Sequence, residues 1–221
     1  MDNLWDKIDL ELIDRILSST SFNDDQIRLL SEALQSYDKI LDLCTGFGNL
    51  AKILVGQGKT VYGIDISPRS LDYAKRKVGN QKAGKLYLVE GDGGNLEYDS
   101  EFDVVSCASS FCLSDTDPAA CGIYKALRPG GGFAVTGFES CEKQKSMELM
   151  QSELSRKIED GSLVITPEEI EKLQEYEKII VPEAEDSSKR VLASLMKNNF
   201  QIRRVESFFH DTAYFILAQK E

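Results

Sequence analysis

The sequence is poor in the residues that build metal centres, disulfide frameworks and membrane spans. Its 221 residues include one histidine and five cysteines, and no two of the cysteines form a CxxC pair. An odd number of cysteines without such a pair disfavours a zinc site or a set of disulfides and indicates a reducing compartment. No stretch approaches the roughly 20 apolar residues that a transmembrane helix requires. We therefore expect neither a bound metal ion nor a membrane span.

Basic residues are also scarce. Lys and Arg number 26 against 37 Asp and Glu, which gives a net charge of −11 at pH 7 and a pI of about 4.7. A surface of this sign repels phosphate groups, so nucleic acids and anionic membranes are disfavoured as partners. The first residues, MDNLWDKIDLELIDRI, have acids where a signal peptide has bases. We expect a cytoplasmic protein that acts on a small molecule; its oligomeric state is not indicated.

Apolar residues at helical spacing begin close to the N-terminus. Their pattern predicts an amphipathic helix over residues 3–18. Asn23 is a suitable N-cap for a second helix, whose apolar face includes Ile27 and Leu34. We assign residues 1–36 to helices that cover the functional site.

From residue 39 onward, short apolar strands alternate with helices. The expected strands read KILDL, TVYGIDI, KLYLVEGD, FDVVSCA and GFAVTGFE. This alternation is typical of βαβ units, which form a parallel sheet with helices on both faces. We expect residues 37–139 to form such a core.

The last third of the chain interrupts this pattern and then completes it. Residues 140–187 are rich in Glu, Lys and Ser and contain two helical stretches, so we expect a helical lid inserted into the fold. Residues 188–221 restore a helix and end in two strands joined at His210 and Asp211, as in an antiparallel hairpin. The expected fold class is α/β. It is a Rossmann-like three-layer sandwich with a seven-stranded, mostly parallel sheet, a C-terminal antiparallel hairpin and a helical cap.

The glycine turn after the first strand is the main functional signal. GFGNLA fits the dinucleotide pattern G-x-G-x-x-A, and Asp65, at the end of the second strand, can accept hydrogen bonds from a ribose. Asp42 precedes the turn, where a carboxylate is unfavourable beside an anionic pyrophosphate but suits a ligand with an ammonium group and a positive sulfur. Asp92 ends the third strand and can accept from the amine of an adenine. Three acids at the carboxyl ends of parallel strands favour a cationic nucleoside.

Taken in order, five motifs resemble those of the class I S-adenosylmethionine-dependent methyltransferases. They are LDLCTGFGN, VYGIDIS, VEGDGGNL, FDVVSCAS and IYKALRPGGGFAV. The resemblance implies S-adenosylmethionine as cofactor and S-adenosylhomocysteine as product. It also implies transfer of a methyl group to an O or N atom of a small-molecule acceptor by in-line displacement.

The same resemblance assigns roles to particular residues. Those expected to hold the amino-acid end, the ribose, the adenine and the methionine chain of the cofactor are Asp42, Cys44, Gly46, Gly48, Asp65, Ile66, Asp92, Gly93 and Cys107. Cys44 is a departure, because it stands where the family usually has its first glycine.

The acceptor side carries weaker signals. His210 and Asp115 are candidate catalytic bases, since an imidazole or a carboxylate can take a proton from the acceptor. A solvent-exposed turn histidine and a helix N-cap are the alternative interpretations. Phe111, Glu139 and Trp5 are candidate substrate contacts, although a tryptophan on an apolar helix face is more often part of the core.

Two other functions stay open at this point. An NAD-dependent oxidoreductase would use the same glycine turn but needs no acid at Asp42. A non-catalytic module that binds S-adenosylmethionine is also possible, because the stretch SSFCLSDTDP lacks the histidines found there in many small-molecule members of the family.

Overall fold

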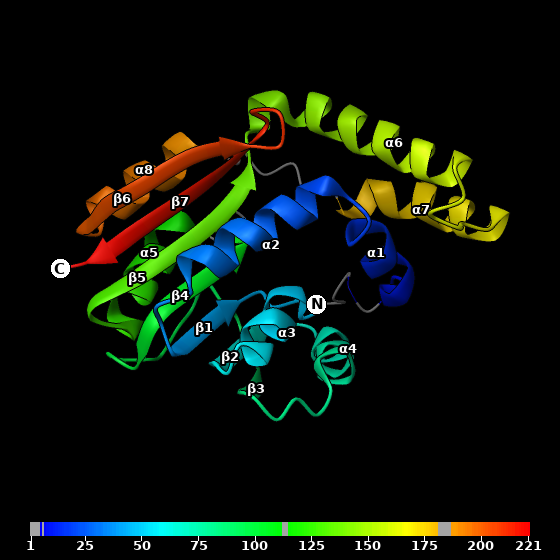
Figure 1. The fold of residues 1–221 in the computed structure, drawn as a ribbon. Coiled ribbons are helices and arrows are strands. Elements are labelled where there is room, and N and C mark those ends of the chain that lie inside the picture. The colour runs from blue at the N-terminus through cyan, green and yellow to red at the C-terminus, as the bar shows by residue number, and fades with distance from the viewer. Residues whose placement is uncertain (1–4, 6, 112–114, 181–186) are drawn as a thin grey trace.

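A computed structural model describes residues 5, 7–111, 115–180 and 187–221. Its centre is a seven-stranded sheet of order β3-β2-β1-β4-β5-β7-β6 (Figure 1). Neighbours from β3 to β5 pair in parallel, and β7 is antiparallel to both β5 and β6. The expected fold class is therefore confirmed. The strands are β1 (Lys39–Leu43), β2 (Thr60–Asp65), β3 (Lys85–Glu90), β4 (Phe102–Ala108), β5 (Leu127–Phe138), β6 (Phe200–Phe208) and β7 (Ala213–Lys220).

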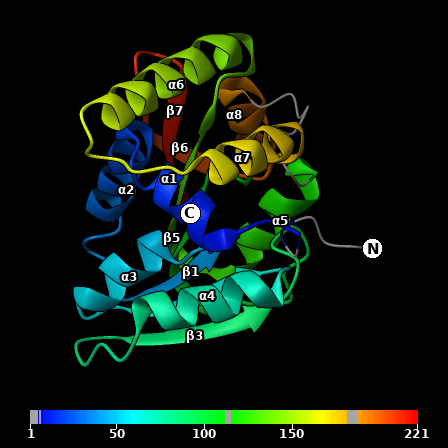
Figure 2. The ribbon, with the colours of Figure 1, turned by 90° about the vertical axis from the view of Figure 1, so that its right-hand side faces the viewer.

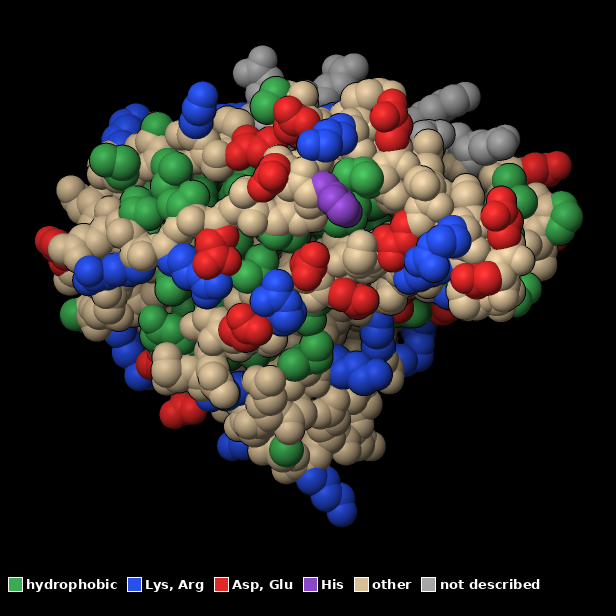
Figure 3. Space-filling view, turned by 45° about the horizontal axis from the view of Figure 1, so that its top comes forward, with side chains coloured by type: hydrophobic (Ala, Val, Ile, Leu, Met, Phe, Trp, Pro, Cys, Tyr) green, Lys and Arg blue, Asp and Glu red, His purple; other side chains and the backbone are tan. Residues whose placement is uncertain are grey.

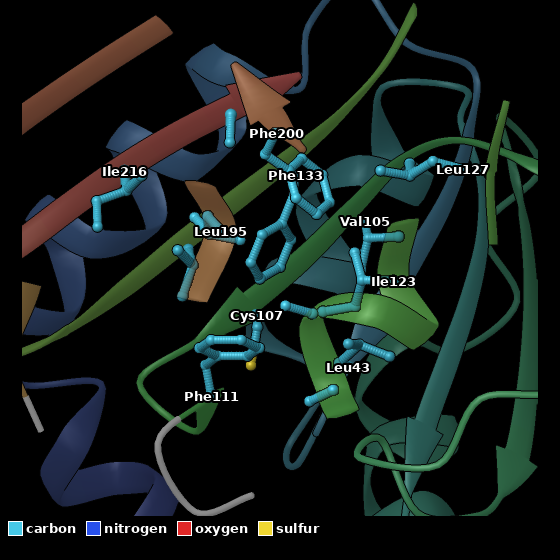
Figure 4. Packing of buried hydrophobic residues seen from close by; sticks show 14 of the residues in the cluster. Leu43, Val105, Cys107, Phe111, Ile123, Leu127, Phe133, Leu195, Phe200 and Ile216 are labelled. Carbon is cyan, nitrogen blue, oxygen red and sulfur yellow. The ribbon is translucent and has the colours of Figure 1, made fainter. Parts of the chain in front are cut away.

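Helices cover both faces of the sheet, because strand residues alternate between the faces and both sets are apolar. On one face, Ile40 and Val104 pack with α2 (Ser21–Ala33), α3 (Asn49–Gly56) and α4 (Pro68–Val78). On the other face, Leu43 and Phe133 pack with α5 (Thr116–Ala126) and α8 (Ser188–Lys197) (Figure 4). The carboxyl ends of β1 to β5 and of β6 therefore meet at one edge of the sheet, which we call the carboxyl edge.

The N-terminal helices differ from the sequence prediction at their starts. Helix α1 spans only Leu10–Leu17, because Asp9 ends the preceding segment as N-cap and accepts a 3.1 Å hydrogen bond from the amide of Leu12. The part of the expected helix at residues 3, 4 and 6 lies outside the described residues. In α2 the N-cap is Thr20, whose hydroxyl accepts from the amide of Asn23, so the assignment of Asn23 as N-cap was wrong.

Helix α1 is buried on two sides. Ile13 packs towards Phe47 in the glycine turn, whereas Leu12 and Ile16 pack against the inserted segment that contains Leu163. That segment forms a short 3-10 helix (Ser140–Glu142), α6 (Lys143–Glu159) and α7 (Pro167–Ile180). Helices α1, α6 and α7, which we call the cap, lie together at the carboxyl edge (Figure 2).

A buried ion pair anchors the cap to the core. Asp14 of α1 is 6% exposed and accepts hydrogen bonds of 2.6 and 2.7 Å from the ammonium group of Lys77. It also accepts one of 2.8 Å from the hydroxyl of Tyr73, so α1 is tied to α4. Burial raises the pKa of Tyr73, and its bond to Asp14 adds to the shift, so this hydroxyl stays protonated.

None of the described helices is long and apolar enough to cross a membrane.

Candidate active site

The turn after β1 is built from residues with left-handed backbone. Cys44, Gly46 and Gly48 have φ angles of 52°, 51° and 73°. Gly48 is the N-cap of α3, and a Cβ at this position would lie 2.9 Å from the Cβ of Ala74 in α4. Glycine removes both the conformational strain and the clash, so the turn can pack directly against α4.

Asp65 joins the end of β2 to this turn. Its carboxylate accepts hydrogen bonds of 3.0 Å from the amide of Gly46 and 2.9 Å from the amide of Ser67. Burial raises the pKa of Asp65, and the amide donors oppose that shift. The amide of Ile66 also donates to this carboxylate. A carboxylate has about four acceptor positions, so after these three bonds Asp65 can still accept from a hydroxyl of a ribose.

The other residues predicted for the nucleoside lie around the same strand ends. Ile66 is 55% exposed, which is unusual for so large an apolar side chain and provides a surface for a flat ring. Asp92 is exposed and accepts a 2.8 Å hydrogen bond from the amide of Gly94. A Cβ on the buried Gly93 would lie 3.6 Å from the sulfur of Cys44, so this loop borders the glycine turn. The structure therefore brings the predicted ribose and adenine contacts together.

Asp42 lies behind the turn rather than on its surface. Its carboxylate is 3% exposed and accepts hydrogen bonds of 2.7 Å from the hydroxyls of Thr45 and Ser106. Desolvation raises the pKa of Asp42 to about 6, although the two hydroxyl donors oppose the shift. Asp42 thus links β1 to the turn and to β4, and a direct contact with the amino-acid end of a ligand stays a prediction.

Sequence reasoning overlooked Thr45 and Ser106. A serine in the otherwise apolar buried strand FDVVSCA was the available signal, because a buried hydroxyl needs a partner.

Cys44 and Cys107 form a hydrogen-bonded pair of thiols beside Asp42. This bond, burial and the nearby carboxylate raise the pKa of Cys107 well above its ordinary value. Cys107 is 1% exposed, so it packs at the end of β4 as an unreactive thiol. Cys112, the next cysteine along the chain, lies outside the described residues.

Two of the expected substrate contacts, Phe111 and Glu139, make contacts within the protein. Phe111 is 3% exposed and packs in the core with its ring centroid 5.3 Å from that of Phe133, and its contact with a substrate stays a prediction. The carboxylate of Glu139 accepts a 3.2 Å hydrogen bond from the amide of Ser188 and so connects the end of β5 to α8.

The third expected contact, Trp5, lies over the glycine turn. Its ring meets the edge of Phe47 at a centroid distance of 6.3 Å, and Phe47 meets Tyr73 of α4 in the same way at 5.7 Å. Trp5 therefore touches the turn expected to bind the cofactor.

Of the two candidate bases, His210 lies apart from the group around Asp65. His210 is in the β6–β7 turn with its side chain exposed (purple in Figure 3), and its carbonyl accepts from Lys145 at 3.1 Å. Strands β4, β5 and β7 separate this turn from β1, a span of roughly 15 Å at about 4.8 Å per strand. Asp115 is exposed at the N-cap position of α5, and its side chain makes no capping hydrogen bond. Catalytic roles for both stay predictions.

The residues at the carboxyl edge fit a cationic nucleoside. They combine a carboxylate with free acceptor positions (Asp65), an exposed apolar side chain (Ile66) and a turn closed by glycines. Among the described residues, no group of three or more His, Cys, Asp or Glu lies together in the manner of a metal site.

Residues 40–131 match the family model described as a methyltransferase domain. Over 116 residues the chain is 34% identical to an uncharacterized methyltransferase of Synechocystis sp., covering 50% of this chain and 51% of that protein. Over 104 residues it is 35% identical to a demethylmenaquinone methyltransferase of Lactobacillus johnsonii, covering 44% of this chain and 43% of that protein. These alignments span about half the length of the relatives or less.

A solved structure shows the same fold. It is an S-adenosylmethionine-dependent methyltransferase from Mesorhizobium loti, with a TM-score of 0.65 at 17% identity, covering 92% of this chain and all of that one. Residues 40–131 are therefore similar to a methyltransferase domain, and the chain shares the fold of a solved S-adenosylmethionine-dependent methyltransferase.

Proposed function

We propose that the protein transfers a methyl group from S-adenosylmethionine to an O or N atom of a small, apolar acceptor. The observation that carries this proposal is the carboxylate of Asp65. It is fixed at the carboxyl end of β2 by the amide of Gly46 and stands next to the exposed Ile66. A ribose and a purine would find a charged acceptor and an apolar surface there.

The chain's contribution to such a reaction is positioning. The bound cofactor supplies a methyl group on a positively charged sulfur. Asp65 and the glycine turn hold the nucleoside, and the cap excludes water from the carboxyl edge, so that donor and acceptor meet in line. A general base is required only when the acceptor enters protonated, and His210 and Asp115 remain the candidates.

Two observations support an apolar small-molecule acceptor. One relative is named a demethylmenaquinone methyltransferase. Near the carboxyl edge, Phe138, Leu149 and Met150 are apolar and only partly buried. The net charge of −11 argues against a nucleic-acid acceptor. A cytoplasmic location is part of the same proposal.

Calorimetry tests the cofactor assignment. Wild-type protein should bind S-adenosylhomocysteine and give no response to NAD. Asp65→Ala should weaken the binding at least tenfold, through the loss of charge-assisted hydrogen bonds worth roughly 1.5–3 kcal/mol each. Asp72→Ala, which removes an exposed carboxylate of α4, is the matched control and should bind like wild type. Binding of NAD in place of S-adenosylhomocysteine would favour the oxidoreductase alternative.

Catalysis is tested separately. The protein is incubated with S-adenosylmethionine labelled in its methyl group and a small-molecule extract, and labelled products are separated by chromatography. A product that forms with wild type and Asp72→Ala but not with Asp65→Ala supports methyl transfer. Tight binding without any labelled product would favour the non-catalytic module.

A further inference from the structure

Gln26 is a buried polar residue that is not among the residues expected to bind the cofactor. It lies on the face of α2 turned towards the sheet and is 7% exposed. Its side-chain oxygen accepts a 2.8 Å hydrogen bond from the hydroxyl of Thr136 in β5 and another from the hydroxyl of Ser109, directly after β4. Two donors on one oxygen fix the plane of the amide.

The amide nitrogen of Gln26 has no partner among the residues that the structure describes. Among the described residues, the side-chain polar atoms that are fully buried and lack a hydrogen-bond partner are the hydroxyls of Ser146 and Ser194. The amide nitrogen of Gln26 is not among them. The NH2 group therefore reaches the accessible surface. A donor in this situation costs free energy unless a ligand or water accepts from it, so the fixed amide presents a hydrogen-bond donor ready for a ligand.

The position of this donor is close to where the reaction would occur. Ser109 has a left-handed backbone with φ of 57°, and its amide donates to the carbonyl of Thr136 at 3.1 Å, so the chain after β4 is held at the carboxyl edge. The backbone at Cys107 and Ala108, just before it, is the segment expected to border the methionine end of the cofactor. The side chain of Gln26 therefore contacts Ser109, which directly follows the segment expected to border the methionine end of the cofactor.

The surroundings of Gln26 are apolar and largely aromatic. Phe22, one helical turn earlier on α2, stacks on Phe138 at a centroid distance of 4.2 Å. Phe208 and Phe209 lie within 5.6 Å of Phe22 in the same cluster. Phe22, Phe208 and Phe209 are buried, whereas Phe138 is only partly buried. A ligand that reaches the amide would thus meet the accessible part of Phe138, which favours a flat, apolar molecule.

We propose that Gln26 is a substrate-positioning residue whose NH2 group donates a hydrogen bond to an oxygen atom of a flat, apolar methyl acceptor. This inference rests on the proposed function and narrows it to acceptors of the phenol or enol class. A hydrogen bond to the acceptor oxygen orients the ring and stabilises the deprotonated, anionic form of the acceptor, whose proton leaves to water or to a general base before the methyl group is transferred.

The test uses two probes that differ by one hydroxyl group, 2-naphthol and naphthalene. Their binding is measured at pH 8 by equilibrium dialysis against the full chain saturated with S-adenosylhomocysteine. Wild type should bind 2-naphthol roughly tenfold more tightly than naphthalene, the size expected of one buried hydrogen bond.

Gln26→Glu is the decisive variant. Its carboxylate can still accept from Ser109 and Thr136, so the local fold is kept, but it has no NH2 group to donate. It should lose the preference for 2-naphthol while its affinity for S-adenosylhomocysteine stays at the wild-type value, and burial of the new carboxylate should lower only its thermal midpoint. Asn23→Asp, which makes the same chemical change at a less buried position of α2, is the matched control and should keep the preference.

Three results would count against the inference in distinguishable ways. Equal binding of the two probes by wild type, or an unchanged preference in Gln26→Glu, overturns the role of Gln26 while leaving the proposed function in place. Failure of wild type to bind S-adenosylhomocysteine overturns the proposed function, and this inference with it.

Discussion

The carboxylate of Asp65 and the backbone amide of Gly46 are joined by a 3.0 Å hydrogen bond. This bond connects the end of β2 to the turn after β1, so the residue expected to bind the ribose also shapes the turn expected to bind the amino-acid end. The shape of the turn and the expected binding of the ribose therefore depend on the same side chain.

Asp65→Asn should lower the free energy of unfolding of the ligand-free protein by about 1.5–3 kcal/mol, because an amide NH2 would replace an oxygen that accepts from a backbone N–H. Urea denaturation measures this. The exposed substitution Asp72→Asn should change the stability by less than about 0.5 kcal/mol. An Asp65→Asn protein as stable as wild type would show that the carboxylate does not hold the turn.

Gly48→Ala tests the close packing of the glycine turn against α4. Gly130 is a matched control, because its φ of 76° is almost that of Gly48 but a Cβ there would meet nothing within 4 Å. Gly130→Ala should cost roughly 1–2 kcal/mol of backbone strain. Gly48→Ala should cost clearly more, through the 2.9 Å contact with Ala74, and should weaken binding of S-adenosylhomocysteine. Equal losses of thermal stability in the two variants would show that the contact with Ala74 does not destabilise Gly48→Ala.

Asp42 should make the protein less stable as the pH rises from about 4 to 6. Burial raises the pKa of Asp42 to about 6 in the folded protein from an ordinary value of 3.8. The folded state therefore binds more protons than the unfolded state in this window, and stability falls as the pH rises through it. At about 1.4 kcal/mol per pKa unit, the loss is roughly 3 kcal/mol.

Asp42→Asn is neutral at every pH and should lack this loss. The difference in unfolding free energy between Asp42→Asn and wild type should therefore grow from pH 4 to pH 6 and then level off. Urea titrations at several pH values measure it. Parallel pH profiles for the two proteins would contradict the raised pKa.

Trp5 should report on the glycine turn by fluorescence. It is the single tryptophan of the sequence, and its ring contacts Phe47 inside the turn. Binding of S-adenosylhomocysteine should change the emission of wild-type protein, and Phe47→Leu should reduce that change. Phe102→Leu, which alters a buried ring at the opposite end of the sheet, is the comparison and should preserve the signal. An emission spectrum that does not change when S-adenosylhomocysteine is added would show that Trp5 does not report on the glycine turn.

The sequence by itself determined the sheet and the edge at which the residues expected to bind the cofactor lie. Alternating apolar strands and helices specify a parallel sheet through local periodicity, and the carboxyl ends of such strands share one edge. The acids at positions 65 and 92 were therefore predictable as neighbours of the glycine turn, although they are far apart in the chain. The start of α1 was less predictable, because the apolar spacing extends to residues before Asp9. The helix begins only after Asp9, whose side chain caps it by accepting from the amide of Leu12.

Only the tertiary structure decided which polar side chains pair and which aromatic side chains are buried. Ser106 reaches Asp42, and Gln26 meets Ser109 and Thr136, across 64 to 110 residues of sequence. Phe111 became part of the core, while Trp5 came to lie over the turn. Periodicity describes one element at a time, whereas these contacts depend on how elements pack against one another. The fold could therefore be predicted from the sequence, whereas the side chains expected to surround the acceptor could not.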